Sequence, residues 1–139
     1  MPLLLLKVNR LSAVFWDVDG TLAETEMDGH RPAFNMAFKE LDLPFVWDEA
    51  LYNRLLAIPG GQRRVKLHAE TCGVHLSQNQ LDQVRDRKRV HYLERVRQGH
   101  VHLRPGVKRL LQELNRAGVQ QWIVTSSGSA SVMALLEQI

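Results

Sequence analysis

The stretch LSAVFWDVDGTLAET, residues 11–25, decides the fold of this chain. Its first eight residues form a dense apolar run, which is typical of a parallel-sheet strand that is buried on both faces. Asp17 and Asp19 stand two residues apart at the end of that strand, so their side chains emerge on the same side. Gly20 then lets the backbone turn closely around a ligand. Because open α/β sheets bind ligands at the carboxyl ends of their strands, we expect a functional site here.

Two carboxylates at this spacing suit phosphoryl transfer. One can attack phosphorus and form an aspartyl-phosphate, while the other protonates the leaving alkoxide and later takes a proton from water. Crowding the two is expected to raise the proton affinity of one of them. A divalent cation is required in such a site because a negative nucleophile approaches a negative phosphoryl group. The alternative interpretation is a strand-end turn or a structural calcium site, since Asp and Gly are common in turns.

The sequence between the first strand and residue 100 has the periodicity of helices. Pro32 suits a first helical position, and apolar residues at helical spacing follow it. Asp48 is placed to cap a second helix, whose apolar face reaches Ile58 before the break at residues 59–61. We expect a third helix to stop at Gly73.

A fourth helix is expected from a capping box. Ser77 and Gln80 have the required spacing of three residues, and Leu76 and Leu81 flank them as a hydrophobic staple. This pattern predicts a helix that continues to Gly99.

Strand and helix patterns return together after residue 100. Pro105 opens an expected helix that Gly118 closes, and residues 119–125 (VQQWIVT) form a second strand candidate. Small residues at 126–129 predict a turn, and a last helical stripe runs over residues 132–139.

This order of elements predicts an α/β protein with a Rossmann-like, parallel-sheet core and an inserted all-helical cap domain. The expected core, incomplete at this length, comprises residues 1–24 and 101–139, and the expected cap comprises residues 25–100.

The string DVDGT, residues 17–21, resembles motif I of the haloacid dehalogenase (HAD) superfamily of hydrolases. The resemblance implies that Asp17 is the catalytic nucleophile and Asp19 the general acid/base. It further implies Mg²⁺ as cofactor, held by the Asp17 carboxylate and the Asp19 backbone carbonyl.

The second strand candidate resembles motif II of the same superfamily. That resemblance makes Thr125 the phosphate-binding hydroxyl, with the Ser126 backbone N–H beside it. A hydroxyl and turn amides at a helix N-terminus are suited to bind an anion. The helical insert resembles the cap of the β-phosphoglucomutase branch.

Several further strings resemble the CbbY-type phosphatases of that branch. They occupy residues 23–26, 28–31, 33–35, 59–64 and 103–107. That group is associated with dephosphorylation of xylulose-1,5-bisphosphate, so the resemblance implies this phosphorylated sugar as the substrate. The substrate-binding residues it implies, besides Thr125 and Ser126, are Glu26, His30, Gly60, Gly61 and Arg64.

The chain departs from the family pattern in two ways. The cap turn usually reads GGKER, whereas Gln62 and Arg63 stand here in place of the lysine and glutamate, although an extra arginine still suits a second phosphate. Family members also continue past motif II to a lysine and a pair of acidic residues, so the resemblance covers the N-terminal portion only. We therefore expect the 139-residue chain by itself to be poorly active or inactive. A β-phosphoglucomutase-like phosphomutase and a truncated, non-catalytic phosphate-binding remnant are the alternatives.

Composition excludes several other classes of protein. The hydrophobic fraction of 45% and the charged fraction of 24% are those of a globular domain, and a single cysteine excludes a disulfide framework within the chain. The net charge of +3 suits an anionic partner, but the basic residues near positions 85–97 alternate with acids, so we expect no nucleic-acid partner. The start of the sequence lacks the pattern of a signal peptide and no stretch could span a membrane, so we expect a cytoplasmic monomer.

Overall fold

The computed structural model describes residues 11–138, and residues 1–10 and Ile139 lie outside the described part. The start of the sequence, where we expect no signal peptide, therefore lies outside the described residues. In chain order the elements are β1 (Ala13–Trp16), the π-helix η1 (Glu26–His30), α1 (Arg31–Glu40), α2 (Glu49–Leu55), α3 (Gly61–Thr71), α4 (Gln78–Arg97), α5 (Val107–Arg116), β2 (Gln120–Ile123) and α6 (Ser129–Leu136).

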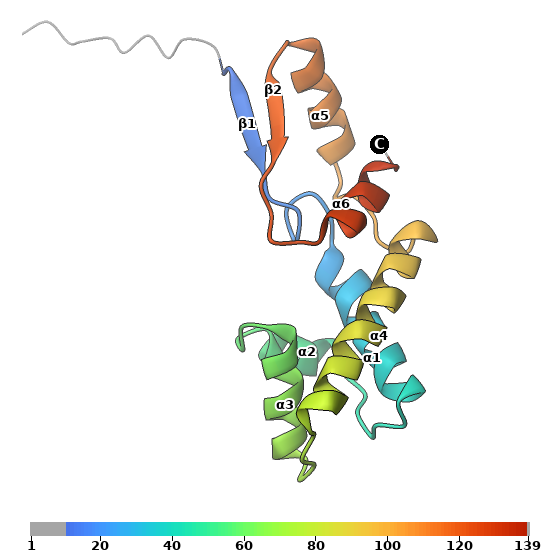
Figure 1. The fold of residues 1–139 in the computed structure, drawn as a ribbon. Coiled ribbons are helices and arrows are strands. Elements are labelled where there is room, and N and C mark those ends of the chain that lie inside the picture. Colours follow the sequence, from blue (N-terminus) through green and yellow to red (C-terminus); the bar gives the residue numbers. More distant parts are fainter. Residues whose placement is uncertain (1–10, 139) are drawn as a thin grey trace, which may run out of the picture.

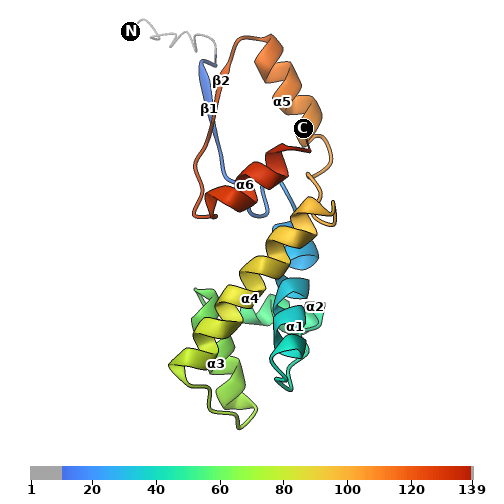
Figure 2. The same ribbon diagram turned by 45° about the vertical axis from the view of Figure 1, so that its right-hand side comes forward.

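The two strands of the described part form a parallel sheet, with Ala13 opposite Gln120 and Trp16 opposite Ile123. Figure 1 shows this sheet with α5 and α6 at one end of the molecule and α1, α2 and α3 at the other. The long helix α4 runs between the two ends and meets α6, as Figure 2 also shows. The α/β class, the parallel sheet and the helical insert are thus confirmed.

One expectation about the sheet is wrong within the described residues. The side chains of Trp16 and Ile123 pack toward α5 and α6, but Phe15 and Trp122 on the opposite face are 68% and 56% exposed. Helices of the described part therefore cover only one face of the sheet, and the apolar run does not produce a strand buried on both faces.

Local capping signals set several helix boundaries. The Asp48 side chain accepts a hydrogen bond from the Leu51 amide at 2.7 Å, and Ser77 and Gln80 form the expected capping box. Gly73, Gly99 and Gly118 adopt positive φ just after helices α3, α4 and α5, as expected for glycine at these positions.

Three helix boundaries differ from the expectation. Helix α2 ends at Leu55 rather than at Ile58, because the amides of Ala57 and Ile58 bond to carbonyls three residues earlier and tighten the last turn before Pro59. Helix α5 begins at Val107, since Gly106 before it has a φ of 84°. Helical structure also begins well before Pro32, in the π-helix η1.

Buried side chains form two clusters. The first lies among α1, α2, α3 and α4 and centres on the fully buried Trp47, Tyr52 and Phe38. The second joins Val18 and Leu22 of the loop after β1 to Leu135 of α6. Residues Ala33, Tyr92 and Val96 of the expected cap belong to this second cluster, so α4 contributes to both. The division into core and cap stays a proposal.

Candidate functional site

The carboxyl ends of β1 and β2 lie side by side, because the strands are parallel and in register. Asp17 directly follows β1, and Thr125 and Ser126 follow β2 after one residue. In Figure 1 the arrowheads of both strands point toward the helical end of the molecule. The structure therefore brings the two predicted motifs to the same edge of the sheet.

The loop after β1 is held closed by its own backbone. The amides of Thr21, Leu22 and Ala23 all approach the Val18 carbonyl, at 3.2, 3.0 and 3.2 Å. Gly20 has a φ of 72°, which residues with side chains rarely adopt. The guanidinium of Arg104, just before α5, donates a hydrogen bond to the Gly20 carbonyl. The loop is thus held by its own backbone hydrogen bonds and by Arg104, which lies on the segment between α4 and α5.

Asp19 is surrounded by hydrogen-bond donors. The hydroxyl of Thr25 lies 2.6 Å from Oδ1, the hydroxyl of Ser127 donates to Oδ2, and Nε2 of His30 lies 3.6 Å from Oδ1. The polar contact with His30, together with the hydrogen bonds from Ser127 and Thr25, outweighs burial and holds the pKa of Asp19 well below its usual range. The expected rise in proton affinity from crowded carboxylates is therefore wrong for Asp19, because these donors favour the charged form.

Asp17 has a more open environment. Its side chain is exposed, and the Thr21 hydroxyl donates to Oδ2 at 3.2 Å. The two acids thus differ: one is free to meet a ligand and the other is tied into the protein. Oxygen donors such as the Asp17 carboxylate and the Asp19 backbone carbonyl are those that Mg²⁺ prefers, and Mg²⁺ normally keeps several waters and substrate oxygens as further ligands. These two groups therefore fit the expected cofactor. Within residues 11–138 no group of three or more His, Cys, Asp and Glu side chains gathers as a metal site.

A hollow of about 770 Å³ opens beside Asp19 and His30. Its core side is the turn after β2, residues 126–131, and its helical side carries Lys88, Arg89 and Tyr92 of α4. Ser126 thus lies in the wall of the hollow, and its phosphate-binding role stays a prediction. The Thr125 hydroxyl accepts a hydrogen bond from the Ser127 amide at 3.1 Å, so it also shapes the turn.

Lys88 was not singled out from the sequence. Its ammonium lies 5.1 Å from the centre of the Phe34 ring and 5.6 Å from that of Tyr92, and burial lowers the pKa of Lys88 to about 8. The sequence does contain a pattern that could have pointed to Lys88. It lies on the apolar stripe of α4, four residues after the buried Val84 and four before the buried Tyr92. Lysine is rarely buried unless it is paired, and Lys88 is half-buried with no ion pair within residues 11–138.

The predicted cap residues divide into two groups. Gly61 lines the hollow, and Gly60 precedes it with a φ of 83°. The other group is engaged within the helices: Glu26 accepts a hydrogen bond from the Tyr52 hydroxyl at 2.6 Å. Arg64 donates to the carbonyls of Leu55 and Ile58 at 2.9 and 3.1 Å, so it holds the turn before α3.

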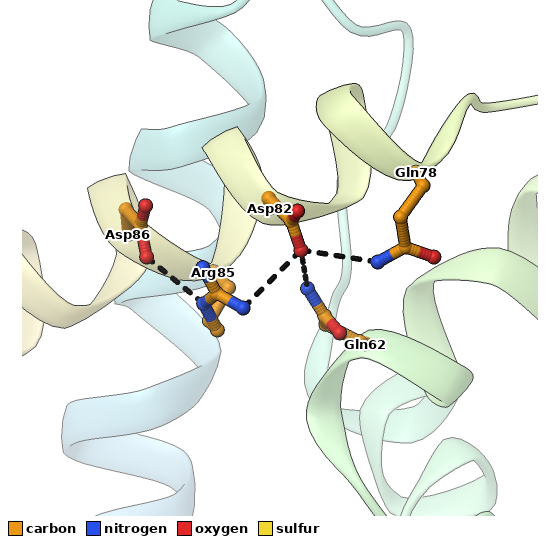
Figure 3. Close-up of polar contacts among 5 residues, drawn as sticks. All are labelled: Gln62, Gln78, Asp82, Arg85 and Asp86. Atoms are coloured by element: carbon orange, nitrogen blue, oxygen red, sulfur yellow. Dashed lines mark hydrogen bonds and ion pairs between the residues drawn. The ribbon is translucent and has the colours of Figure 1, made fainter.

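A second hollow of about 360 Å³ lies between α3 and α4 and shares Gly61, Lys88 and Arg89 with the first. Gln62 at its edge donates to Asp82 at 2.7 Å, as Figure 3 shows. The same carboxylate accepts from Gln78 at 3.0 Å and from Arg85 at 3.2 Å.

The basic residues around this second hollow differ in whether an acid neutralises them. Arg85 is neutralised by Asp82 and also by Asp86, at 2.9 Å (Figure 3). Arg63, Lys88 and Arg89 line the hollow and have no ion pair within residues 11–138. The joined hollows therefore combine one acidic end with a basic wall, which suits a small ligand that carries negative charge.

Comparison with known proteins agrees with this arrangement. A family model described as haloacid dehalogenase-like hydrolase matches residues 11–139. The plasmid-encoded protein CbbY of Cupriavidus necator is 41% identical over 133 residues, which cover 91% of this chain and 52% of that protein. The chain spans about half the length of the curated relatives that it matches first.

Solved structures of CbbY also match this chain. CbbY from Rhodobacter sphaeroides in complex with phosphate superposes with a TM-score of 0.76 at 32% identity, over 92% of this chain and 56% of that one. A substituted form of that protein, in complex with xylulose-1,5-bisphosphate, matches with the same TM-score and coverage at 31% identity. No helix among the described residues is long and apolar enough to cross a membrane.

Proposed function

Because this chain belongs to the haloacid dehalogenase-like hydrolase family, we propose that it carries the nucleophile and the cap of a magnesium-dependent phosphatase that acts on a sugar phosphate. The observation that carries the proposal is the contrast between its two acids. Asp17 is open to a ligand, whereas Asp19 is held by Thr25, Ser127 and His30 in the wall of a hollow.

In this proposal Asp17 attacks phosphorus and the phosphoryl group passes from the substrate oxygen to the Asp17 carboxylate. A proton passes to the leaving oxygen from the pair formed by Asp19 and His30, whose atoms lie 3.6 Å apart. Water then attacks the aspartyl-phosphate and gives up its proton to Asp19. The low pKa keeps Asp19 as a carboxylate between turnovers, which is the form that receives this proton, although the same low pKa makes it a weak base.

The phosphate oxygens would be held by the Thr125 hydroxyl and the Ser126 amide at the start of α6. Mg²⁺, when bound by the Asp17 carboxylate and the Asp19 backbone carbonyl, would neutralise the charge of the incoming phosphate. Within residues 11–138 the remaining positive charge in the hollow comes from Lys88 and Arg89 on α4.

The proposed substrate is xylulose-1,5-bisphosphate. Two observations support a ligand with two phosphates: the adjoining hollows of about 770 and 360 Å³ offer more space than one phosphate needs, and Arg63 and Arg89, which have no ion pair within residues 11–138, line the second. The relative from Rhodobacter sphaeroides that binds this sugar bisphosphate has the same fold over the compared residues. Glu26, His30, Gly60, Gly61 and Arg64 are proposed to contact or to shape the space for the sugar.

The test is magnesium-dependent release of phosphate by the complete product of the gene and by the 139-residue chain. Xylulose-1,5-bisphosphate is compared with xylulose 5-phosphate and with β-glucose 1-phosphate. We expect turnover of the bisphosphate that is lost on chelation of the metal. Conversion of β-glucose 1-phosphate to glucose 6-phosphate without release of phosphate would instead establish a phosphomutase. Binding of phosphate without turnover by the complete product would establish the non-catalytic alternative. A cytoplasmic location and a monomeric state stay predictions, which cell fractionation and size-exclusion chromatography would test.

A further inference from the structure

The chain enters its helical part through one turn of π-helix. Residues Glu26–His30 form η1, and the amide of Arg31 donates to the Glu26 carbonyl, five residues earlier. Such wide turns are rare and occur frequently at functional sites. This one directly follows Thr25, the residue whose hydroxyl meets Asp19.

The wide turn decides which side chains share a face. In an α-helix residues five apart point about 140° away from each other, so they cannot approach one atom together. In a π-helix the hydrogen bond joins residues five apart, which places them nearly above each other. Thr25 and His30 are five apart, and both approach Oδ1 of Asp19, at 2.6 and 3.6 Å. The π geometry is therefore what allows the double contact.

Gly29 allows this turn to approach α4. A Cβ atom at Gly29 would lie 2.7 Å from Cε2 of Tyr92 and 3.1 Å from Cγ2 of Val101. Real Cβ atoms do not come this close to other atoms, so the turn and the Tyr92 ring meet only because residue 29 lacks a side chain.

Tyr92 in turn supports the His30 ring. The two rings are stacked, with centroids 4.1 Å apart and planes within 14°. Tyr92 is 6% exposed, and Lys88 lies over the same ring, so the tyrosine has little freedom to move. Arg95, one turn further along α4, donates to the Asp28 carbonyl at 2.9 Å and so satisfies a backbone group of the wide turn.

We propose that Gly29 and Tyr92 are positioning residues, which together seat the π turn so that His30 is held against Asp19. The inference rests on the proposed function for the role of that contact, but the placement of His30 is a property of the fold. Gly29 does not line the hollow, and Tyr92 lines it with the ring that supports His30. Both act through the imidazole of His30.

The first test follows the His30 ring by NMR in the intact chain, so it does not depend on activity. In Gly29→Ala we expect the His30 ring protons to lose the shielding that the Tyr92 ring gives them, and the cross-relaxation between the two rings to vanish. Gly128→Ala is the matched control, because Gly128 has a φ of −62° and open space around its Cβ position. It should leave both signals unchanged.

If Gly29→Ala does not fold, two substitutions at Tyr92 test the same proposal. Tyr92→Phe keeps the ring and should preserve the His30 signals, whereas Tyr92→Leu should abolish the shielding. Unchanged His30 ring signals in a folded Gly29→Ala or Tyr92→Leu variant would overturn the proposal.

A kinetic measurement on the complete gene product separates positioning from substrate binding. Misplacing His30 should lower kcat of Gly29→Ala by on the order of 10²-fold, the lower end of the range expected for lost acid–base catalysis, with KM changed by less than about threefold. A wild-type protein without phosphatase activity would refute the proposed function and leave the NMR result to decide the placement. A large rise in KM with an unchanged kcat would contradict the positioning role.

Discussion

The hydroxyl of Ser127 donates a hydrogen bond to the carboxylate of Asp19, which lies 108 residues earlier in the chain. This contact ties the turn after β2 to the loop after β1. Since Thr125 also accepts from the Ser127 amide, one serine connects both motifs that the sequence predicts. The two halves of the site are therefore joined by direct hydrogen bonds as well as by the pairing of their strands.

Ser127→Ala should reduce stability in a pH-dependent way. Hydrogen bonds from His30, Ser127 and Thr25 lower the pKa of Asp19 in the folded chain, so their contribution is complete above the ordinary carboxyl pKa of about 4. It is lost as the pH falls below that value toward the depressed pKa. We expect the substitution to lower the free energy of unfolding at pH 7 by about 1–2 kcal/mol, measured by urea titration.

The same titration at about pH 2 provides the contrast, because the difference between Ser127→Ala and wild type shrinks only when the pH approaches the depressed pKa of Asp19 in the folded chain. Ser129→Ala is the matched control, since Ser129 is exposed and its side chain has no hydrogen bond within the described residues. A loss for Ser127→Ala that is equal at both pH values would contradict the assigned cause.

Lys88 should make anion binding depend on pH. Burial lowers the pKa of Lys88 to about 8, so the ammonium is charged below that pH and neutral above it. Sulfate is a suitable probe because its charge is constant over this range. We expect calorimetry to show sulfate affinity falling as the pH rises through 8, by roughly tenfold or more, the value of a charge-assisted hydrogen bond.

Substitutions at Lys88 test this assignment. Lys88→Met should give weak binding at every pH, and Lys88→Arg should bind without the fall near pH 8, because arginine stays charged. Lys66→Met, on the exposed side of α3, should behave as wild type. Persistence of the pH-dependent fall in Lys88→Arg would assign it to another group.

Asn35 should be a main determinant of the stability of the helical part. Its side chain donates to the Trp47 carbonyl at 2.8 Å and accepts from the Trp47 amide at 2.7 Å, beside an indole that is 0% exposed. Asn35→Ala leaves the Trp47 amide without this partner and leaves the Trp47 carbonyl with only the hydrogen bond from Arg31 at 3.3 Å, which should cost about 1–3 kcal/mol in urea unfolding followed by tryptophan fluorescence. Asn53→Ala, exposed on α2, should cost less than about 0.5 kcal/mol. Equal effects of the two substitutions would show that the Trp47 contacts contribute little.

Features that depend on a few neighbouring residues could be predicted from the sequence. The cap at Asp48 and the capping box of Ser77 and Gln80 need only local spacing, and both are present. The meeting of residues 17–21 with Thr125 and Ser126 followed from the rule that parallel strands end at one edge. These predictions used no long-range contact other than strand pairing.

Features that depend on distant side chains were missed. The π turn at Glu26–His30 exists in contact with Tyr92 and Arg95, more than sixty residues away, and no local signal distinguishes it from the start of an α-helix. The depressed pKa of Asp19 depends in part on such contacts, since it is lowered first by His30, which the π turn carries, and then by Ser127, which is remote in sequence. The exposed side chains of Phe15 and Trp122 are a third example. An apolar strand sequence indicates that the strand can be buried, but it does not indicate which elements cover each face.

The most direct test of the central claim is the covalent state of Asp17 during turnover. The complete gene product is mixed with Mg²⁺ and xylulose-1,5-bisphosphate, quenched in acid and digested, and the peptide that contains residues 11–25 is analysed by mass spectrometry. We predict a phosphoryl group on Asp17 in the wild type and in Asp19→Asn, and none in Asp17→Asn, which should also lose phosphate release. Phosphate release by wild type without any phosphoryl group on Asp17, or undiminished release by Asp17→Asn, would contradict the account.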